Sequence, residues 1–422
     1  MSLRSSLLLA PLVLLAACGR PAPTWHGDIR PVVEGRCAGC HAAGGVAPFA
    51  LKDLAATRAH VSAIVDSVES RRMPPWQASA ADVTYREDPS LTDAQVALFR
   101  AWMEAGMPEG DASKPGTPLP PVSAGLERVD LELAMPNPYA TRIAPDDYRC
   151  FPLDWPRAEP TYVTGFDALP GNPSTVHHLA VYLVPPDSAH LPLQWDAEEE
   201  GPGYTCFGGP SGGRDSTVPT LLLSAWIPGF AGSTFADGLG ILVPPGSRLV
   251  LQVHYNAAQV GTEDLTRVRF QLADSVQKRA VYAPWLKLDW VAGSMNIPAG
   301  KEGVLHQVVD DPRDFFKLFA PDFDFPNGFN VHSAMFHMHN LGRHGEALIV
   351  KPGGERVRLL DIPQWDFNWQ REYRFTSPVA FEPGDKVALR CTFDNTSGSK
   401  DVNWGEGTAD EMCVVNLLVS PR

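Results

Sequence analysis

Two cysteines and a histidine near the N-terminus are spaced so that they can hold one prosthetic group. Cys37 and Cys40 are three positions apart, and His41 follows directly. Two thiols at this spacing can add to the two vinyl groups of a haem, while the adjacent imidazole reaches the iron from the same side. The alternatives are half of a zinc site or a redox cysteine pair with a chance histidine. The motif predicts one covalently bound haem c.

The second axial ligand of this haem must come from another segment. Met73 is followed by two prolines, which cannot continue a helix and would hold the segment as a loop. A methionine ligand would raise the reduction potential of the haem relative to a second histidine. The segment resembles the axial-methionine loop of small bacterial cytochrome c domains, so we expect Met73 to be the ligand. Met103 and Met107 are alternatives, and His26 and His60 are weaker ones.

Three histidine clusters farther along the chain could bind metal ions. They contain the pair His177 and His178, the single His254, and the pair His337 and His339. Side chains two apart in a strand share a face, so His337 and His339 can chelate one ion. Neighbours in a regular strand point to opposite faces, so His177 and His178 can share an ion only at a bulge or a strand end. Otherwise, one of that pair would be a core residue and the other a surface residue.

The haem motif lies in a part of the chain with helical signals. In residues 90–106, Thr92 and Gln95 have the spacing of a capping box. One apolar face follows, formed by Val96, Phe99 and Met103. The next stretch is rich in Pro, Ser and Gly and is typical of a linker. We therefore expect a small α-helical domain over residues 19–112 and a linker over residues 113–126.

From about residue 127 the pattern changes to short apolar and aromatic runs between turn residues. Examples are residues 161–163, 179–184, 248–255, 347–350 and 386–391. These runs are typical of antiparallel β-sandwiches, and about 300 residues of them predict two such domains in tandem. We place these domains at residues 127–275 and 276–422, with the junction near residues 273–283. The predicted fold class is mainly β, preceded by the helical domain.

The first 18 residues have the features of a lipoprotein signal peptide. Arg4 gives a positive start, and the apolar residues 7–15 are too short to span a bilayer. Residues 15–18 resemble a bacterial lipobox, in which the cysteine, here Cys18, is lipidated and becomes the mature N-terminus. Ordinary cleavage nearby is the alternative. We expect an exported protein held on the membrane by its lipid anchor alone, facing the periplasm or the cell exterior.

Composition is compatible with an exported, globular redox protein. The 422 residues suffice for two or three domains, and 44% of them are hydrophobic. The formal net charge of -14 argues against nucleic acid as a partner. Of seven cysteines, one would carry the lipid and two the haem. In an oxidising compartment the remaining four predict two disulfides.

The order of the histidine clusters resembles the copper type II, ascorbate-dependent monooxygenases, the family of the peptidylglycine α-hydroxylating and dopamine β-monooxygenases. The resemblance covers roughly residues 135–420. The best matches are residues 175–178, 251–255, 337–342 and 410–413. Each motif alone is weak, but four motifs in this order are highly specific.

The resemblance implies two copper ions, one in each of two jelly-roll domains. His177, His178 and His254 match the ligands of an electron-transfer copper. His337, His339 and Met412 match the ligands of the copper that binds and activates dioxygen. The ligand types fit, because imidazoles suit copper in both oxidation states and a thioether favours Cu(I). Met412 and the two histidines are therefore the expected catalytic centre.

The family pattern also assigns the other cysteines and two polar residues. It pairs Cys150 with Cys206 and Cys391 with Cys413. The second of these disulfides would fix Met412 beside its site. Tyr148 and Gln252 match family residues near the first copper and the cleft between the sites, so they are candidates for substrate or ligand contacts.

Three positions depart from the peptide-amidating members of the family. Those enzymes hold the terminal carboxylate of the substrate with an arginine, an asparagine and a tyrosine, which fall on Met335, Val414 and Asn416 here. None of these can make a charged, bidentate contact, so we expect no peptide amidation. His332 and His344 flank the third cluster, either as surface residues or as donors of hydrogen bonds to the metal ligands.

These features predict a copper monooxygenase that hydroxylates a C–H bond of a small organic substrate with O2. An external donor, either an ascorbate-like reductant or a redox protein, would supply two electrons. The hypothesis is that the haem domain relays them to the copper at His177, His178 and His254. The alternative is a non-catalytic haem and copper protein that transfers electrons or binds copper. A multicopper oxidase would need a cysteine ligand near a histidine and a methionine, a setting that the β region lacks.

Overall fold

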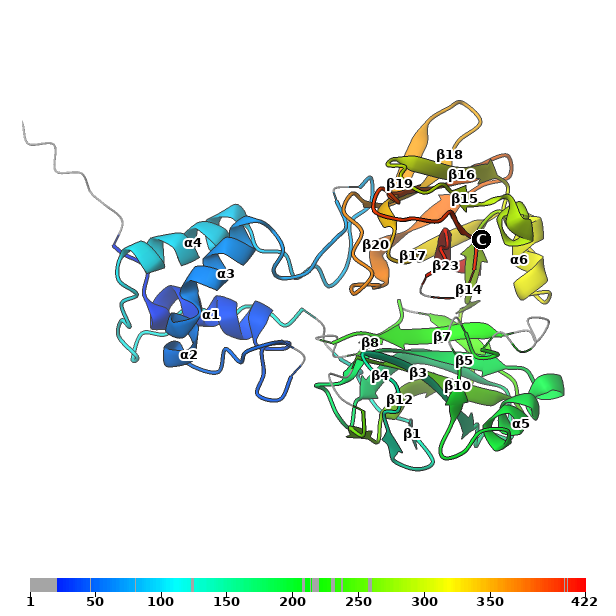
Figure 1. The fold of residues 1–422 in the computed structure, drawn as a ribbon, viewed down its shortest axis with the longest axis horizontal. Helices are drawn as coiled ribbons and strands as arrows, with labels where there is room; N and C mark the ends of the chain where they lie inside the picture. The colour runs from blue at the N-terminus through cyan, green and yellow to red at the C-terminus, as the bar shows by residue number, and fades with distance from the viewer. Residues whose placement is uncertain are drawn as a thin grey trace, which may run out of the picture.

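The computed structural model describes residues 21–45, 47–79, 81–122, 125–206, 209–212, 214, 220–228, 232–236, 238–256, 260–405, 407 and 409–422. The chain is mainly β, as expected, with short helices first and two β units after them (Figure 1). The expected signal peptide and Cys18 lie outside the described residues. Within the part of the chain that the structure describes, no helix is long and apolar enough to cross a membrane.

The helical unit is built from short segments around one apolar core. Its elements are η1 (Trp25–Ile29), α1 (Arg30–Val32), η2 (Val33–Cys37), α2 (Leu54–Ala59), α3 (Val61–Glu69) and α4 (Asp93–Glu104). The capping box of Thr92 and Gln95 is present and begins α4. Trp102, not Met103, is the third buried residue of that helix, because the apolar stripe continues three residues after Phe99.

The start of the expected linker packs on the helical unit. Leu119 contacts the helical core, and Arg36 Nη1 donates to Pro120 O at 2.9 Å. Gly116 N donates to His26 O at 2.8 Å, and a Cβ at Gly116 would collide with Gly27 O. The chain therefore leaves the helical unit only after about residue 121, because these contacts hold the stretch before it.

The first β unit consists of two sheets around one core. One sheet has the order β6 (Tyr204–Thr205), β3 (Asp146–Asp154), β10 (Arg248–Asn256), β5 (Val176–Val184), β7 (Leu221–Trp226). The other has the order β1 (Leu131–Ala134), β12 (Arg267–Ala273), β4 (Thr161–Leu169), β9 (Leu239–Val243), β13 (Lys278–Arg279), with β8 (Ser233–Thr234) on β4. Phe151 and Leu179 from the first sheet meet Phe270 from the second in one buried cluster.

The second β unit repeats this plan. One sheet has the order β14 (Val281–Trp285), β23 (Val414–Pro421), β17 (Phe329–His337), β20 (Tyr373–Phe381). The other has the order β16 (Val304–Asp310), β21 (Lys386–Phe393), β18 (Gly342–Val350), β19 (Arg356–Ile362), and α6 (Arg313–Phe319) packs on β14. The apolar runs expected as strands lie in β4, β5, β10, β18 and β21. The chain changes units at residue 280, between β13 and β14.

The arrangement of the two β units determines where a site can lie. Figure 1 shows them stacked, with β7 of the first unit facing β14 of the second. Each unit contributes to this junction the sheet that carries its metal-ligand candidates. Histidine side chains from both units can therefore lie around one common space at this junction.

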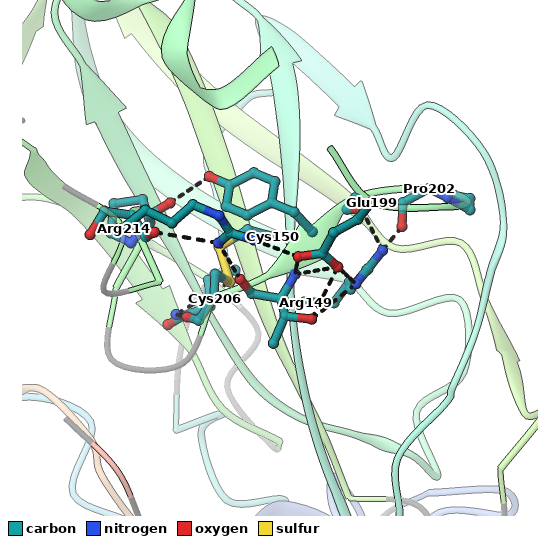
Figure 2. Close-up of a disulfide and its surroundings, with 12 residues drawn as sticks. Arg149, Cys150, Glu199, Pro202, Cys206 and Arg214 are labelled. Carbon is teal, nitrogen blue, oxygen red and sulfur yellow. Dashed lines mark hydrogen bonds and ion pairs between the residues drawn. A yellow bond between two sulfur atoms is a disulfide. The ribbon is translucent and has the colours of Figure 1, made fainter. Parts of the chain in front are cut away.

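Both disulfides implied by the family pattern are present. Cys150 pairs with Cys206, and Cys391 pairs with Cys413. Figure 2 shows the first disulfide beside Arg149, whose side chain is 3% exposed and whose Nη1 lies 2.5 Å from Glu199 Oε2. Because Glu199 neutralises this buried guanidinium, the polar group is accommodated next to the disulfide.

Candidate metal centres

A three-histidine site lies on two adjacent strands of the first β unit. His177 and His178 come from β5, and His254 comes from β10. Their Nδ1 atoms lie 3.2 to 3.3 Å from one another. The pairing of β10 with β5 shifts register here, since His254 faces His178 but Tyr255 faces Val176. The shift leaves His177 as an extra residue, which turns two neighbouring side chains toward one point.

The proton positions at this site leave nitrogen lone pairs free. His254 Nε2 lies 2.9 Å from Asp146 Oδ1, and because a carboxylate only accepts, Nε2 donates and Nδ1 keeps its lone pair. Burial, followed by repulsion from His177, lowers the pKa of His254 to about 4, so the ring is neutral at neutral pH. Nitrogen atoms about 3 Å apart can surround one ion at about 2 Å, the usual metal–imidazole distance. The residues fit a copper ion.

A second site lies at the end of β17 in the other unit. His337 Nε2 and His339 Nε2 are 3.3 Å apart. The expectation that both residues lie in a strand is wrong in one detail, because β17 ends at His337 and His339 follows in the connection to β18. Gln370 Oε1 accepts from His337 Nδ1 at 2.6 Å, and Asp410 O accepts from His339 Nδ1 at 2.9 Å. Both contacts place the ring proton on Nδ1, so that each Nε2 carries a lone pair of the kind that binds a metal.

Met412 completes this second ligand set. It is 6% exposed and lines the same cavity as His337. The neighbouring Cys413 is held by its disulfide to Cys391. The fully buried Glu411 accepts hydrogen bonds from the backbone N–H groups of His339, Leu341 and Met412, at 2.8, 2.5 and 3.3 Å. One carboxylate thus connects the turn that carries His339 to the loop that carries Met412.

Sequence reasoning missed the residues that orient the ligands. Asp146, Gln370 and Glu411 each contact a ligand or its backbone. Glu411 lies inside a recognised motif, and Asp146 lies two residues before Tyr148, so both had a weak local signal. Gln370 had none, since it lies 33 positions from the histidine it contacts.

One cavity of about 370 Å³ opens onto both sites. His178 of the first unit and His337 and Met412 of the second line it. Tyr148, whose ring stacks on His254 at 4.1 Å, and Gln252 also line it. So do the three positions that depart from the peptide-amidating enzymes, Met335, Val414 and Asn416. Among the described residues that line this cavity there is no Asp, Glu, Lys or Arg.

The expected haem residues are only partly brought together. Cys37 and Cys40 are half-buried and form no disulfide, and Phe49 O accepts from His41 Nδ1 at 2.9 Å, which leaves His41 Nε2 free. These three residues fit covalent haem attachment. Met73 is 37% exposed and lines another cavity with Trp365 and Asn340, and His41 is not among the described residues that line that cavity.

The remaining candidates have structural partners of their own. His60 stacks on Phe49 at 3.9 Å, on a ring that also contacts His41, whereas His26 lies 3.5 Å from Glu109. Met103 and Met107 pack against the helical core. His332 is 2.9 Å from Ser420 Oγ, and His344 is 2.6 Å from Asp361 Oδ1. Among the described residues, neither His332 nor His344 forms a hydrogen bond or an ion pair with a metal-ligand candidate.

Comparisons with known proteins agree with the geometry of the β units. Residues 321–419 match the family described as "Copper type II ascorbate-dependent monooxygenase, C-terminal domain". Peptidyl-glycine alpha-amidating monooxygenase A of Xenopus laevis is 26% identical over 311 residues, which is 72% of this chain and 29% of that protein.

Two further relatives match a shorter stretch. DBH-like monooxygenase protein 1 of Gallus gallus is 24% identical over 58% of this chain, and Dopamine beta-hydroxylase of Homo sapiens is 24% identical over 60% of it. The match spans 39% of the length of each of these two proteins. Together, these matches support the copper type II, ascorbate-dependent monooxygenase family for the β-rich part of this chain.

Proposed function

We propose that this chain is a copper-dependent monooxygenase that uses O2 to hydroxylate a C–H bond of a small organic substrate. In this proposal each β unit is a jelly-roll domain with one copper ion. The observation that carries the proposal is the shared cavity, since His178 from one ligand set and His337 and Met412 from the other line the same space. A protein that only stores copper has no need of a substrate-sized cavity between two sites.

Copper held by imidazole and thioether ligands supplies one-electron chemistry and, as Cu(I), reacts with dioxygen. His337, His339 and Met412 would hold the catalytic ion, and Gln370 keeps the proton of His337 on Nδ1. His177, His178 and His254 would hold the electron-transfer ion, and Asp146 keeps the proton of His254 on Nε2. The apolar cavity walls bind the substrate and exclude water.

The lining of the cavity supports an uncharged substrate. Burying a carboxylate or an ammonium group without a partner is costly, and the described lining offers neither an arginine, a lysine nor a carboxylate. Met335, Val414 and Asn416 would leave the terminal carboxylate of a peptide unpaired. We therefore keep the prediction that a peptide ending in glycine is not hydroxylated.

The helical unit is proposed to be a cytochrome c domain that supplies electrons. Support comes from the free thiols of Cys37 and Cys40 and from the tautomer of His41 that Phe49 O selects. Met73 stays the predicted second ligand. The external donor is an ascorbate-like reductant or a redox protein. Export and lipidation at Cys18 stay predictions, and the two disulfides support export because disulfides persist in oxidising compartments.

The test is oxygen uptake by the protein loaded with copper and haem. The protein is reduced without oxygen and then mixed with oxygen and a series of uncharged aromatic or aliphatic compounds. We expect at least one compound to stimulate uptake and to be hydroxylated. Met412→Leu should remove this response, whereas Met295→Leu, at a buried methionine of the same unit, should keep it. If haem and copper are both reduced and reoxidised but no compound stimulates uptake, the protein is an electron carrier or a copper-binding protein instead.

A further inference from the structure

A segment of the helical unit lies on the second β unit. We term residues 74–79 and 81–89, between α3 and α4, the docking segment; Figure 1 shows this connection reaching toward β20. Ser79 N donates to Asp361 O at 2.8 Å, and Arg86 N donates to Arg374 O at 2.7 Å. Tyr85 Oη donates to Leu359 O at 2.9 Å. These acceptors belong to β19 and to β20, which are the last strands of their sheets. The docking segment therefore covers two open sheet edges.

Aromatic side chains complete this contact. Trp76 packs against Tyr373 with ring centroids 4.9 Å apart and against Tyr85 at 5.8 Å. The guanidinium carbon of Arg371 lies 4.8 Å from the centre of the Trp76 ring. Edge-to-face rings and a half-buried cation over an indole are specific, attractive arrangements. The helical unit is thus held against residues 371–373, immediately before and at the start of β20.

The haem-attachment motif faces the same residues. A cavity of about 350 Å³ is lined on one side by Gly39 and Cys40 and on the other by Trp369, Arg371 and Tyr373. A group attached at Cys40 would therefore have its edge toward residues 369–373.

The residue between Trp369 and Arg371 contacts the second metal site directly. Gln370 accepts the hydrogen bond of His337 Nδ1 at 2.6 Å and lines the cavity between the two metal sites. The path from Arg371 to His337 thus consists of one peptide linkage, the side chain of Gln370 and one hydrogen bond. We propose that residues 369–373 are the entry point for electrons from the helical unit and that Gln370 connects this entry point to His337, so that the C-terminal site is reduced first.

This inference rests on the proposed function and differs from the sequence-based hypothesis, which directs electrons to the three-histidine site. From the same cavity, that route begins at Pro228 and Ile227, follows β7, and crosses to β5 where Trp226 faces Leu179, beside His178. This route passes through two residues, Trp226 and Leu179, between the cavity and the ligand, whereas the route from Arg371 passes through Gln370 alone. In the step proposed, the haem iron goes from Fe(II) to Fe(III) while one Cu(II) becomes Cu(I), and an external one-electron donor restores Fe(II).

The test follows the haem rather than product. The full chain, loaded with haem and Cu(II), is kept free of oxygen and substrate, its haem is reduced by a flash with a photoreductant, and haem reoxidation is read from its absorption. His254→Ala and His339→Ala each disrupt one copper site, which metal analysis verifies. We expect the fast reoxidation phase to persist in His254→Ala and to be lost in His339→Ala. Loss in His254→Ala, or persistence in His339→Ala, would overturn the proposal.

A second pair of variants leaves both copper sites intact. Trp76→Ala weakens the docking segment, and the control Pro228→Ala changes a residue that lines the cavity beside Cys40 but lies outside the docking segment. Because misplacing a donor relative to its acceptor is costly, the fast phase should fall about tenfold or more in Trp76→Ala and stay unchanged in Pro228→Ala. Unchanged copper EPR spectra in both variants exclude damage to the sites. Equal rates in the two variants, or a loss confined to Pro228→Ala, would contradict the proposed entry point.

The same measurements separate this inference from the proposed function. The flash experiment needs neither substrate nor oxygen, whereas hydroxylation can be driven by a chemical reductant of copper. If electrons pass from the haem to copper but no substrate is hydroxylated, the proposed monooxygenase activity is refuted and the proposed entry point is not. If substrate is hydroxylated but no electrons pass from the haem to copper, only the entry point is refuted.

Discussion

The two metal sites are fixed by different kinds of structure. All ligands of the three-histidine site lie on β5 and β10, so backbone pairing within one sheet positions them. The second site takes ligands from the end of β17, from the turn after it and from the loop before β23. A few buried polar contacts and a disulfide hold these pieces together. The first site should therefore tolerate changes outside its ligands, and the second should not.

The largest effect is expected from removing a ligand of either site. His339→Ala and His254→Ala should each lose one of two bound copper ions, because each set loses an imidazole and keeps too few donors. In His339→Ala, hydroxylation should also fall by more than about 100-fold, since even an outer contact of a metal ligand is worth 10- to 100-fold. Metal analysis and oxygen uptake measure both. A variant that loses both ions would show that the two sites are not independent.

Removing a disulfide should distinguish the sites by function rather than by stability. Replacing Cys150 and Cys206 by alanine opens a link across 56 residues, and replacing Cys391 and Cys413 opens one across 22. From loop length, the free energies of unfolding should fall by about 4 and about 3 kcal/mol respectively. Only the second pair adjoins Met412, so only that variant should lose copper from the C-terminal site. Denaturant unfolding and metal analysis test this, and copper loss confined to the first pair would contradict it.

Glu411 should matter for both stability and the second site. Glu411→Ala leaves the buried N–H groups of His339 and Leu341 without their acceptor, which should lower the free energy of unfolding by about 2 kcal/mol or more. Glu411→Gln keeps an acceptor oxygen and is the matched control. Calorimetry of the copper-free variants measures the effect. Equal melting temperatures for the two variants would mean that the carboxylate does not hold the turn.

The smallest effect is a pH dependence of the copper-free protein. Burial lowers the pKa of His254 and of His337 to about 4, whereas both histidines would titrate near 6.5 in the unfolded chain. Between these values the two histidines bind more protons in the unfolded chain, so their contribution to stability should be complete above pH 6.5 and fall as the pH drops toward 4. Melting temperatures between pH 7 and 5 measure this slope. The double variant His254→Asn, His337→Asn should have a shallower slope, and an equal slope would assign the effect to other groups.

The strands and most ligands could be predicted because their signals are local. Alternating apolar runs identify β4, β5, β10, β18 and β21, and short histidine motifs identify the ligand candidates. Strand geometry predicts that His177 and His178 can share an ion only at a bulge or a strand end. The structure has a register shift between β10 and β5 at these two residues. Local pattern could not show that β17 ends at His337, since the turn after it depends on Glu411.

Contacts between distant residues could not be predicted. Gln370 lies 33 positions from His337, Glu411 lies 72 from His339, and Asp146 lies 108 from His254. The docking segment is another case, because nothing within residues 74–89 indicates which sheet edge they cover. Such contacts depend on how the units pack, which a single sequence does not encode in any local pattern.

The most direct test of the central claim is the source of oxygen in the product. The protein loaded with copper and haem is supplied with a reductant, an uncharged substrate that stimulates oxygen uptake, and ¹⁸O2, and the product is analysed by mass spectrometry. We expect one labelled oxygen atom in each hydroxylated molecule and none in the Met412→Leu variant. A hydroxylated product without label, or oxygen uptake that yields no labelled product, would contradict a monooxygenase centre at the cavity between the two histidine sites.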